Sequence, residues 1–119
     1  MESMIRNLTE AECRQAMEQG EFDASLVQGS AALILTQSWC PQWKAMKAYL
    51  EEAERRFPGL TILYVEYDTS PWYEAFMEFK ERRFDNREIP YVRYYRDGTY
   101  TGQSNYVPLE GFLYRLGLE

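Results

Sequence analysis

Residues 31–43 read AALILTQSWCPQW, an apolar run that leads into a cysteine and then into a helical pattern. The continuous apolar run at 31–36 predicts a strand that is covered on both faces. Pro41 suits the first turn of a helix, where its missing amide is not needed, and apolar residues spaced by three and four predict that this helix extends to Phe57. Cys40 is therefore expected between the end of a strand and the start of a helix.

The rest of the chain supplies further strands and helices on both sides of this unit. They are expected as a short strand ending at Asn7, a helix from the Thr9–Glu12 capping box to Gly20, a short helical turn within 22–28, a strand at 60–68, a helix opening at Ser70-Pro71, a hairpin of 91–95 and 99–102 around Asp97-Gly98, and a closing helix at 108–116. The order β-α-β-α-β-α-β-β-α predicts an α/β fold in which a central mixed sheet carries helices on both faces. We expect one domain over residues 1–119.

Composition and charge exclude several classes of function. The hydrophobic fraction of 45% predicts a folded globular chain, and the net charge of −6 argues against general nucleic-acid binding. No run approaches the ~18 consecutive apolar residues that a membrane span needs, and the N-terminus has no secretion-signal pattern, which predicts a cytoplasmic protein. Five arginines lie among acidic residues, which favours a solvated mixed-charge surface over an anion-binding patch: Arg82, Arg83, Arg87, Arg93 and Arg96.

The chain has two cysteines and no histidine. This excludes a disulfide framework, an all-cysteine metal site and the histidine-activated nucleophiles, so we expect neither a metal nor a cofactor. Cys40 at a helix N-terminus would meet free amides and the positive end of the helix dipole, which favour a thiolate, and Lys44 would add to this effect. Cys13 is expected on the first helix as a small half-buried hydrophobe, and a bridge to Cys40 is disfavoured.

Several short motifs, in this order and spacing, resemble the thioredoxin family over nearly the whole chain. They are Trp39-Cys40-Pro41-x-Trp43-Lys44-x-Met46, the strand ending in Asp68, the pair Ile89-Pro90, and Asp97-Gly98 in the hairpin turn. The resemblance implies the thioredoxin fold, with Cys40 as the nucleophilic cysteine and Pro90 as the cis-proline beside it. It also implies a peptide-binding surface made by Trp39, Pro41, Trp43, Ile89, Pro90 and Tyr91.

The sequence also departs from the family at chemically important positions. Trp43 stands where the resolving cysteine would be, Ile34 aligns with the family's buried aspartate, and Tyr64 aligns with the lysine partner of that aspartate. Asn105-Tyr106 aligns with the glycine near the groove, which predicts crowding on that side. Trp43 itself fits either the helix core or the groove surface.

Two functions from different classes fit this sequence. The first is a single-cysteine thiol–disulfide oxidoreductase that forms mixed disulfides with a protein or peptide client and relies on glutathione or another external thiol for release. The alternative is a redox-inactive module that binds a peptide or partner protein through its aromatic groove. An iron–sulfur carrier like the single-cysteine glutaredoxins is disfavoured, because their Cys-Gly-Phe-Ser motif is absent. Glu66 and Asp68 are expected to be solvated carboxylates at a strand end.

Overall fold

A computed structural model describes residues 4–118 of the chain. Its elements are β1 (Met4–Asn7), α1 (Glu10–Gln19), η1 (Ala24–Leu26), β2 (Ser30–Thr36), α2 (Pro41–Arg56), β3 (Thr61–Glu66), η2 (Tyr67–Thr69), α3 (Tyr73–Arg83), β4 (Tyr91–Arg96), β5 (Thr99–Ser104) and α4 (Leu109–Arg115). The strands form one sheet in the order β1-β3-β2-β4-β5. The first three are parallel to one another, and β4 and β5 are each antiparallel to their neighbour, so the predicted α/β architecture with a mixed sheet is confirmed.

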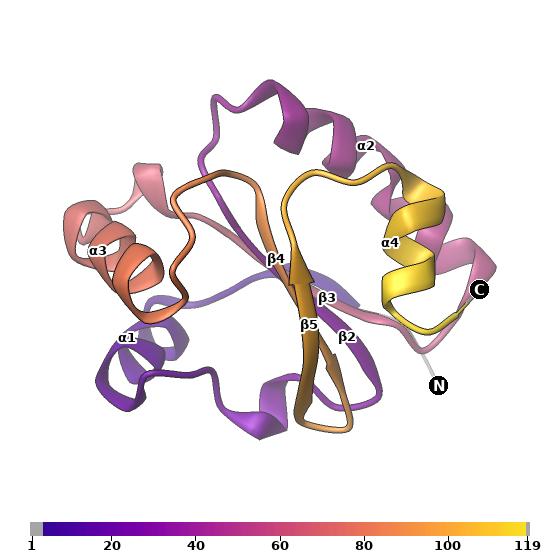
Figure 1. Ribbon diagram of the computed structural model, residues 1–119, viewed down its shortest axis with the longest axis horizontal. Coiled ribbons are helices and arrows are strands. Elements are labelled where there is room, and N and C mark those ends of the chain that lie inside the picture. The colour runs from indigo at the N-terminus through magenta and orange to yellow at the C-terminus, as the bar shows by residue number, and fades with distance from the viewer. Residues whose placement is uncertain (1–3, 119) are drawn as a thin grey trace.

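The sheet separates two apolar cores. Figure 1 shows α1 and α3 on one side of the sheet and α2 and α4 on the other. Alternation along β2 sends Leu33 and Leu35 into the first core and Ile34 into the second, which explains why a continuous apolar run was needed here. Along β4, Tyr91 and Tyr95 face the first core, and Val92 and Tyr94 face the second.

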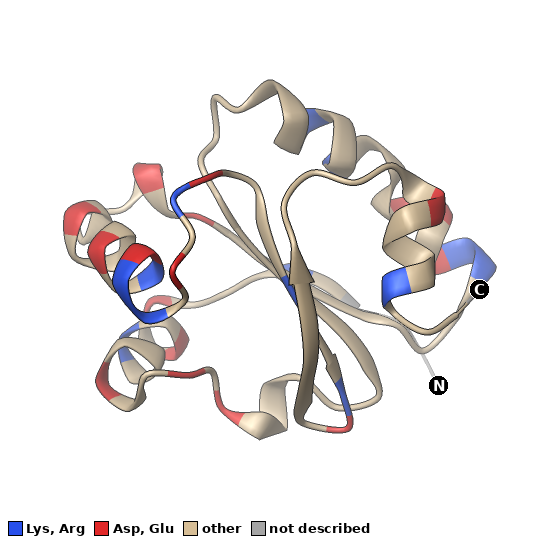
Figure 2. Cartoon of the chain, viewed as in Figure 1, with Lys and Arg blue, Asp and Glu red and all other residues tan. Residues whose placement is uncertain are grey.

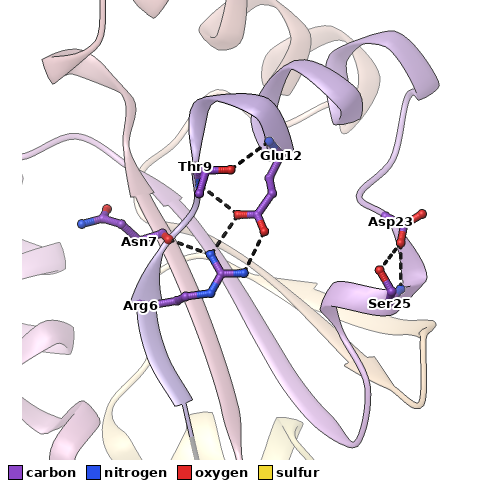
Figure 3. Close-up of polar contacts among 6 residues, drawn as sticks. All are labelled: Arg6, Asn7, Thr9, Glu12, Asp23 and Ser25. Carbon is purple, nitrogen blue, oxygen red and sulfur yellow. Dashed lines mark hydrogen bonds and ion pairs between the residues drawn. The ribbon is translucent and has the colours of Figure 1, made fainter.

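The start of α1 has the capping box that the sequence predicted. Thr9 Oγ1 accepts from the Glu12 amide at 3.1 Å, and the Thr9 amide donates to Glu12 Oε1 at 2.8 Å (Figure 3). Arg6, at the end of β1, donates to both oxygens of Glu12 at 2.9 and 2.8 Å. These hydrogen bonds lower the pKa of Glu12 to about 2. The pair therefore ties the edge strand to the first helix.

The third strand and the third helix are shorter than predicted. β3 ends at Glu66, where the chain turns into η2, and α3 begins at Tyr73 rather than at Ser70. The turn is closed because both the amide and the hydroxyl of Ser70 donate to the Tyr67 carbonyl, at 3.3 and 2.9 Å. It places the Tyr67 ring in the first core, 5.4 Å from the ring centroid of Phe76. Burial of this tyrosine thus ends the strand early.

One of the five clustered arginines contradicts the predicted solvated surface. Arg93 is only 6% exposed, and its guanidinium donates to the Tyr95 and Tyr91 hydroxyls at 2.8 and 2.9 Å and to Glu21 at 2.6 Å. Its guanidinium carbon lies 3.9 Å from the Phe84 ring centroid, as expected for a planar cation that stacks on aromatic faces. The other four are exposed: Arg82, Arg83, Arg87 and Arg96. Figure 2 shows basic and acidic residues together along α3.

No helix within residues 4–118 combines the length and the apolar character needed to cross a membrane.

Candidate functional site

Cys40 is the N-cap residue of α2, as the sequence predicted. Its amide donates to the Gln37 carbonyl at 3.2 Å, and its carbonyl accepts from the Lys44 amide at 3.1 Å, so the backbone around the cysteine is fixed on both sides. The sulfur faces the next chain segment, with Sγ 3.7 Å from the Ile89 carbonyl oxygen. Only 4% of the residue is exposed. The thiol therefore presents little surface to a reagent in this arrangement.

The loop that leads into Cys40 is held by η2, which follows β3. Asp68 accepts from the Ser38 amide at 2.7 Å and from the Ser38 hydroxyl at 2.6 Å. The Trp39 indole donates to the side-chain oxygen of Gln37 at 2.7 Å, although 60% of Trp39 is exposed. Gln37 in turn donates to the Tyr67 hydroxyl at 3.4 Å. Asp68 is therefore an anchor of the cysteine loop, and the expectation of a merely solvated carboxylate is wrong for it.

Trp43 fills the position where the resolving cysteine of a dithiol would lie. It is fully buried, and its indole Nε1 donates to Glu66 Oε2 at 2.7 Å. Lys47 lies 3.7 Å from the same carboxylate oxygen, and the Tyr64 ring centroid lies 5.3 Å from that of Trp43. Of the two roles open to Trp43, core packing is the one observed. Glu66 is likewise a hydrogen-bonded partner rather than a solvated carboxylate.

The segment beside the sulfur carries the remaining residues expected at the site. The Ile89–Pro90 peptide bond is cis; Ile89 is half-buried and Pro90 is buried. The Pro90 carbonyl accepts from the Asn105 side-chain amide at 3.0 Å, so Asn105 holds this segment. Tyr91 is fully buried and its hydroxyl donates to Gln103 at 2.5 Å.

The expected surface residues therefore separate into two groups. Trp39 and Pro41, the chain neighbours of Cys40, are exposed, and Ile89, whose carbonyl faces the sulfur, is partly exposed. Trp43 and Tyr91 differ from the expectation, because neither side chain presents surface to a ligand. Their rings were expected near the groove from their sequence positions, but the pattern could not show that each one points into a core.

Cys13 lies far from this chemistry in the packing of the chain. It belongs to the first core, with no exposed surface, whereas Cys40 belongs to the second core across the sheet. Burial and the neighbouring carboxylates of Glu10 and Glu12 raise the pKa of the Cys13 thiol to about 12. Both cysteines are free thiols. Cys13 is thus an inert buried residue in this fold and not a partner for Cys40.

Within residues 4–118, no group of three or more aspartate, glutamate or cysteine side chains is arranged to hold a metal ion. Two residues that hold segments next to Cys40 were not singled out from the sequence: Gln37 and Lys80. The hydrogen-bond partner of Gln37, Tyr67, lies 30 residues away in the sequence, and Lys80 donates to a backbone carbonyl 8 residues away. No local motif would have identified them.

Comparison with protein-family models and with curated proteins gives no match. Solved structures do match. Thioredoxin O2 from Arabidopsis thaliana, in its oxidized state, aligns with a TM-score of 0.66 at 16% identity over 94% of this chain and 93% of that chain. Thioredoxin F from spinach chloroplast aligns with a TM-score of 0.66 at 11% identity, over 95% and 90% of the two chains.

A third match comes from a structure of the thiol resolving mechanism in yeast mitochondrial 1-Cys peroxiredoxin via glutathione/thioredoxin systems. It has a TM-score of 0.64 at 16% identity and covers 95% of this chain and 93% of that chain. These alignments span nearly the full length of both partners at low identity. The chain therefore has the thioredoxin fold, and the likeness establishes the fold alone.

Proposed function

We propose that the protein is a single-cysteine thiol–disulfide oxidoreductase in which Cys40 is the nucleophile. The observation that carries the proposal is the position of Cys40 as the N-cap residue of the 16-residue helix α2, where its side chain makes no hydrogen bond to the helix amides. The first amides of a helix lack intrahelical acceptors, and together with the helix dipole they stabilise an anion placed there. A thiolate is the reactive form in disulfide exchange, so this position supports the chemistry.

The reaction proceeds by two exchanges at sulfur. The Cys40 thiolate attacks one sulfur of a client disulfide, a new S–S bond forms, and the other client sulfur leaves as a thiolate that takes up a proton. An external thiolate then attacks the Cys40 sulfur, releases the first client sulfur as a thiol, and leaves Cys40 in a mixed disulfide with the external thiol. A second external thiol restores Cys40. The client disulfide is thereby reduced by two electrons, and two external thiols are oxidised to one disulfide.

The resolving thiol has to come from another molecule. Trp43 has no thiol, and Cys13 is buried in the opposite core. Glutathione is the external thiol we propose, in a reducing cytoplasmic compartment. The yeast structure that aligns with this chain concerns thiol resolution through glutathione and thioredoxin systems, which gives a precedent on the same fold.

The client surface we propose is smaller than the sequence suggested. It consists of Trp39 and Pro41, which adjoin Cys40 in the chain, and the backbone of Ile89 and Pro90, of which the Ile89 carbonyl faces the sulfur. An exposed indole offers a large apolar contact at low entropic cost, which suits an extended peptide chain. Trp43 and Tyr91 support this surface from below through their packing.

A second candidate is a non-catalytic module that binds a peptide at the same surface. Two observations favour it: only 4% of Cys40 is exposed, and its sulfur is already engaged by the Ile89 carbonyl. A module needs Trp39 and the neighbouring backbone but no reactive sulfur. The two candidates therefore differ in one property, the ability of Cys40 to form and release a mixed disulfide.

The test uses a Cys13→Ser protein, so that Cys40 is the only thiol, incubated with glutathione disulfide. The oxidoreductase predicts that intact-mass analysis detects one added glutathionyl group, which excess reduced glutathione removes. The control, Cys13→Ser with Cys40→Ser, takes up none. If Cys40 is alkylated by iodoacetamide yet gains no glutathionyl group, the module is the better description.

A further inference from the structure

Three consecutive backbone carbonyls beside the cysteine are each held by a different part of the fold. The carbonyl of Glu88 accepts from Lys80 Nζ at 2.5 Å. The carbonyl of residue 89 faces Cys40 Sγ, and the carbonyl of residue 90 accepts from Asn105. The donors belong to α3, to the N-cap of α2 and to the loop after β5. No other described backbone segment touches the sulfur through a hydrogen bond.

Lys80 is an unusual residue to find in this role, because its side chain is buried with no exposed surface. Removing an ammonium group from water is costly unless polar partners replace the water. Its partners are the Glu88 carbonyl and the face of Tyr91, whose ring centroid lies 5.8 Å from Nζ. Burial lowers the pKa of Lys80 to about 8, against the opposing influence of the carboxylates of Glu81 and Glu88.

The position of the Ile89 carbonyl follows from its two neighbours. Each peptide unit is rigid. Once the Glu88 carbonyl is held, the Ile89 carbonyl can change its position only by rotation about the φ and ψ angles of Ile89. On the other side, Asn105 holds the carbonyl of Pro90, and the proline ring fixes φ at that residue. The carbonyl that faces the sulfur is thus confined between two anchored units.

We propose that Lys80 is a positioning residue for the Cys40 site, which holds the Glu88 carbonyl and thereby fixes the segment against which a client disulfide aligns. This inference rests on the proposed function, since it assumes that Cys40 exchanges disulfides. Lys80 itself has no contact with the sulfur, and it acts through the segment 88–90.

Two reactions of Cys40 distinguish a positioning role of Lys80 from an effect on access to the thiol. Alkylation by iodoacetamide needs only that the small reagent reaches the thiolate. Disulfide exchange also needs the attacked and leaving sulfurs in line with Cys40, and a client chain that lies along residues 89–90. Displacing reacting groups by about 1 Å can cost about 100-fold in rate. Loss of the Lys80 anchor should therefore lower the rate of exchange relative to the rate of alkylation.

The experiment compares these two rates in the Cys13→Ser protein and in the same protein with Lys80→Met. The exchange partner is a disulfide-bonded peptide, and both reactions are followed by intact mass. We expect the ratio of exchange to alkylation to fall about 10-fold or more in Lys80→Met and to recover in Lys80→Arg, which keeps a cationic donor. Arg82→Met, which removes an exposed cation from the same helix, should leave the ratio unchanged.

The outcomes are separable. If Lys80→Met changes both rates by the same factor, the lysine is only structural and the inference is overturned. If the Cys13→Ser protein with Lys80 intact forms no mixed disulfide, the proposed function itself fails. The anchoring of the segment is then still decided by a measurement that needs neither client nor reaction.

That measurement is a pH titration of backbone amide signals by NMR in the chain with Cys13→Ser and Cys40→Ser, which has no thiol left to titrate. The Ile89 amide shares a peptide unit with the carbonyl that Lys80 holds. The charged or titratable groups that face Lys80 are Glu81, Glu88 and Tyr91, and burial raises the pKa of Tyr91. An inflection of the Ile89 signal near pH 8 supports the anchor, and a flat signal through this range refutes it.

Discussion

Replacing Asp68 by alanine tests whether local opening of the cysteine loop controls access to Cys40. The Asp68 carboxylate accepts two hydrogen bonds from Ser38, at 2.7 Å from the amide and 2.6 Å from the hydroxyl. Cys40 lies two residues after Ser38 and is 4% exposed. If the loop must leave Asp68 before a reagent reaches the sulfur, the variant should open more often.

The size of the effect follows from the two bonds. A hydrogen bond to a charged group contributes about 1.5–3 kcal/mol net, and the half-buried position of Asp68 lets water replace part of that. We take about 2 kcal/mol for the pair. At about 1.4 kcal/mol for each factor of ten, the alkylation rate of Cys40 should rise about 30-fold.

The assay is iodoacetamide labelling under native conditions, with peptide mapping to separate the two cysteines. Cys13 has no exposed surface and reports global unfolding, so Cys40 should react faster than Cys13 in the unaltered chain. The matched control is Asp23→Ala. Asp23 accepts from the amide of Ser25 at 3.1 Å and also from its hydroxyl, at the start of η1 (Figure 3). This variant loses the same kind of contact without freeing the cysteine loop, so its Cys40 rate should stay unchanged.

Two results would refute the reasoning. Equal acceleration of Cys40 by Asp23→Ala and Asp68→Ala would mean that the thiol is reached only through global unfolding. An unchanged Cys40 rate in Asp68→Ala, with a measurable loss of stability, would mean that the thiol opens by a route that leaves the Ser38 contact intact.

Three further predictions concern stability. Glu12→Gln should lower the free energy of unfolding by about 1–2 kcal/mol at pH 7; this is the effect of the pKa change from 4.5 to about 2, discounted because the side chains of Arg6 and Glu12 are 35% and 20% exposed. Since the folded pKa of Glu12 is depressed, its contribution is present above pH 4.5 and is lost as the pH falls toward 2. The urea unfolding curves of the two proteins should therefore converge in acid. Trp43→Phe should lower the free energy of unfolding by about 1–3 kcal/mol, because the Glu66 bond and part of the core volume are lost; an unchanged urea midpoint would contradict the buried contact. The pKa of Lys80 is about 8 in the folded chain against 10.5 when exposed, so between these pH values the unfolded chain binds more protons than the folded chain. The free energy of unfolding should therefore rise from pH 8 to pH 10, and Lys80→Met should lack this rise in chemical unfolding.

The fold was predictable because its main signals are local. The apolar run at 31–36, the Thr9 capping box and the Asp97-Gly98 turn each act within a few residues, and each forms as predicted. The burial of Arg93 was not predictable, because its charge suggested solvent, whereas a hydrogen bond to Glu21, 72 residues away in the sequence, and the rings of Phe84 and Tyr100 hold it inside. Glu21 lies shortly before η1, Phe84 at the end of α3 and Tyr100 on β5 of the hairpin, and no short window of sequence contains all three.

The site divides in the same way. Cys40 was identified from its place between a strand and a helix, and its exposed neighbour Trp39 from adjacency. The anchors were not identified, because Asp68 acts across 30 residues and Lys80 acts on a carbonyl that has no side-chain signature. A residue that holds backbone leaves no pattern in the sequence.

The burial of Cys40 distinguishes the two candidate functions, because only an oxidoreductase needs the sulfur to become accessible. On one side the cysteine loop is tied to Asp68, and on the other the carbonyls of 88–90 are held in place, so the sulfur is enclosed by two anchored segments. A client that binds Trp39 and the neighbouring backbone can supply the free energy that opens this enclosure, whereas a small reagent cannot. An oxidoreductase of this design should therefore form the mixed disulfide with both reagents, and faster with a disulfide-bonded peptide than with glutathione disulfide. A module would bind the peptide equally well and leave the enclosure closed.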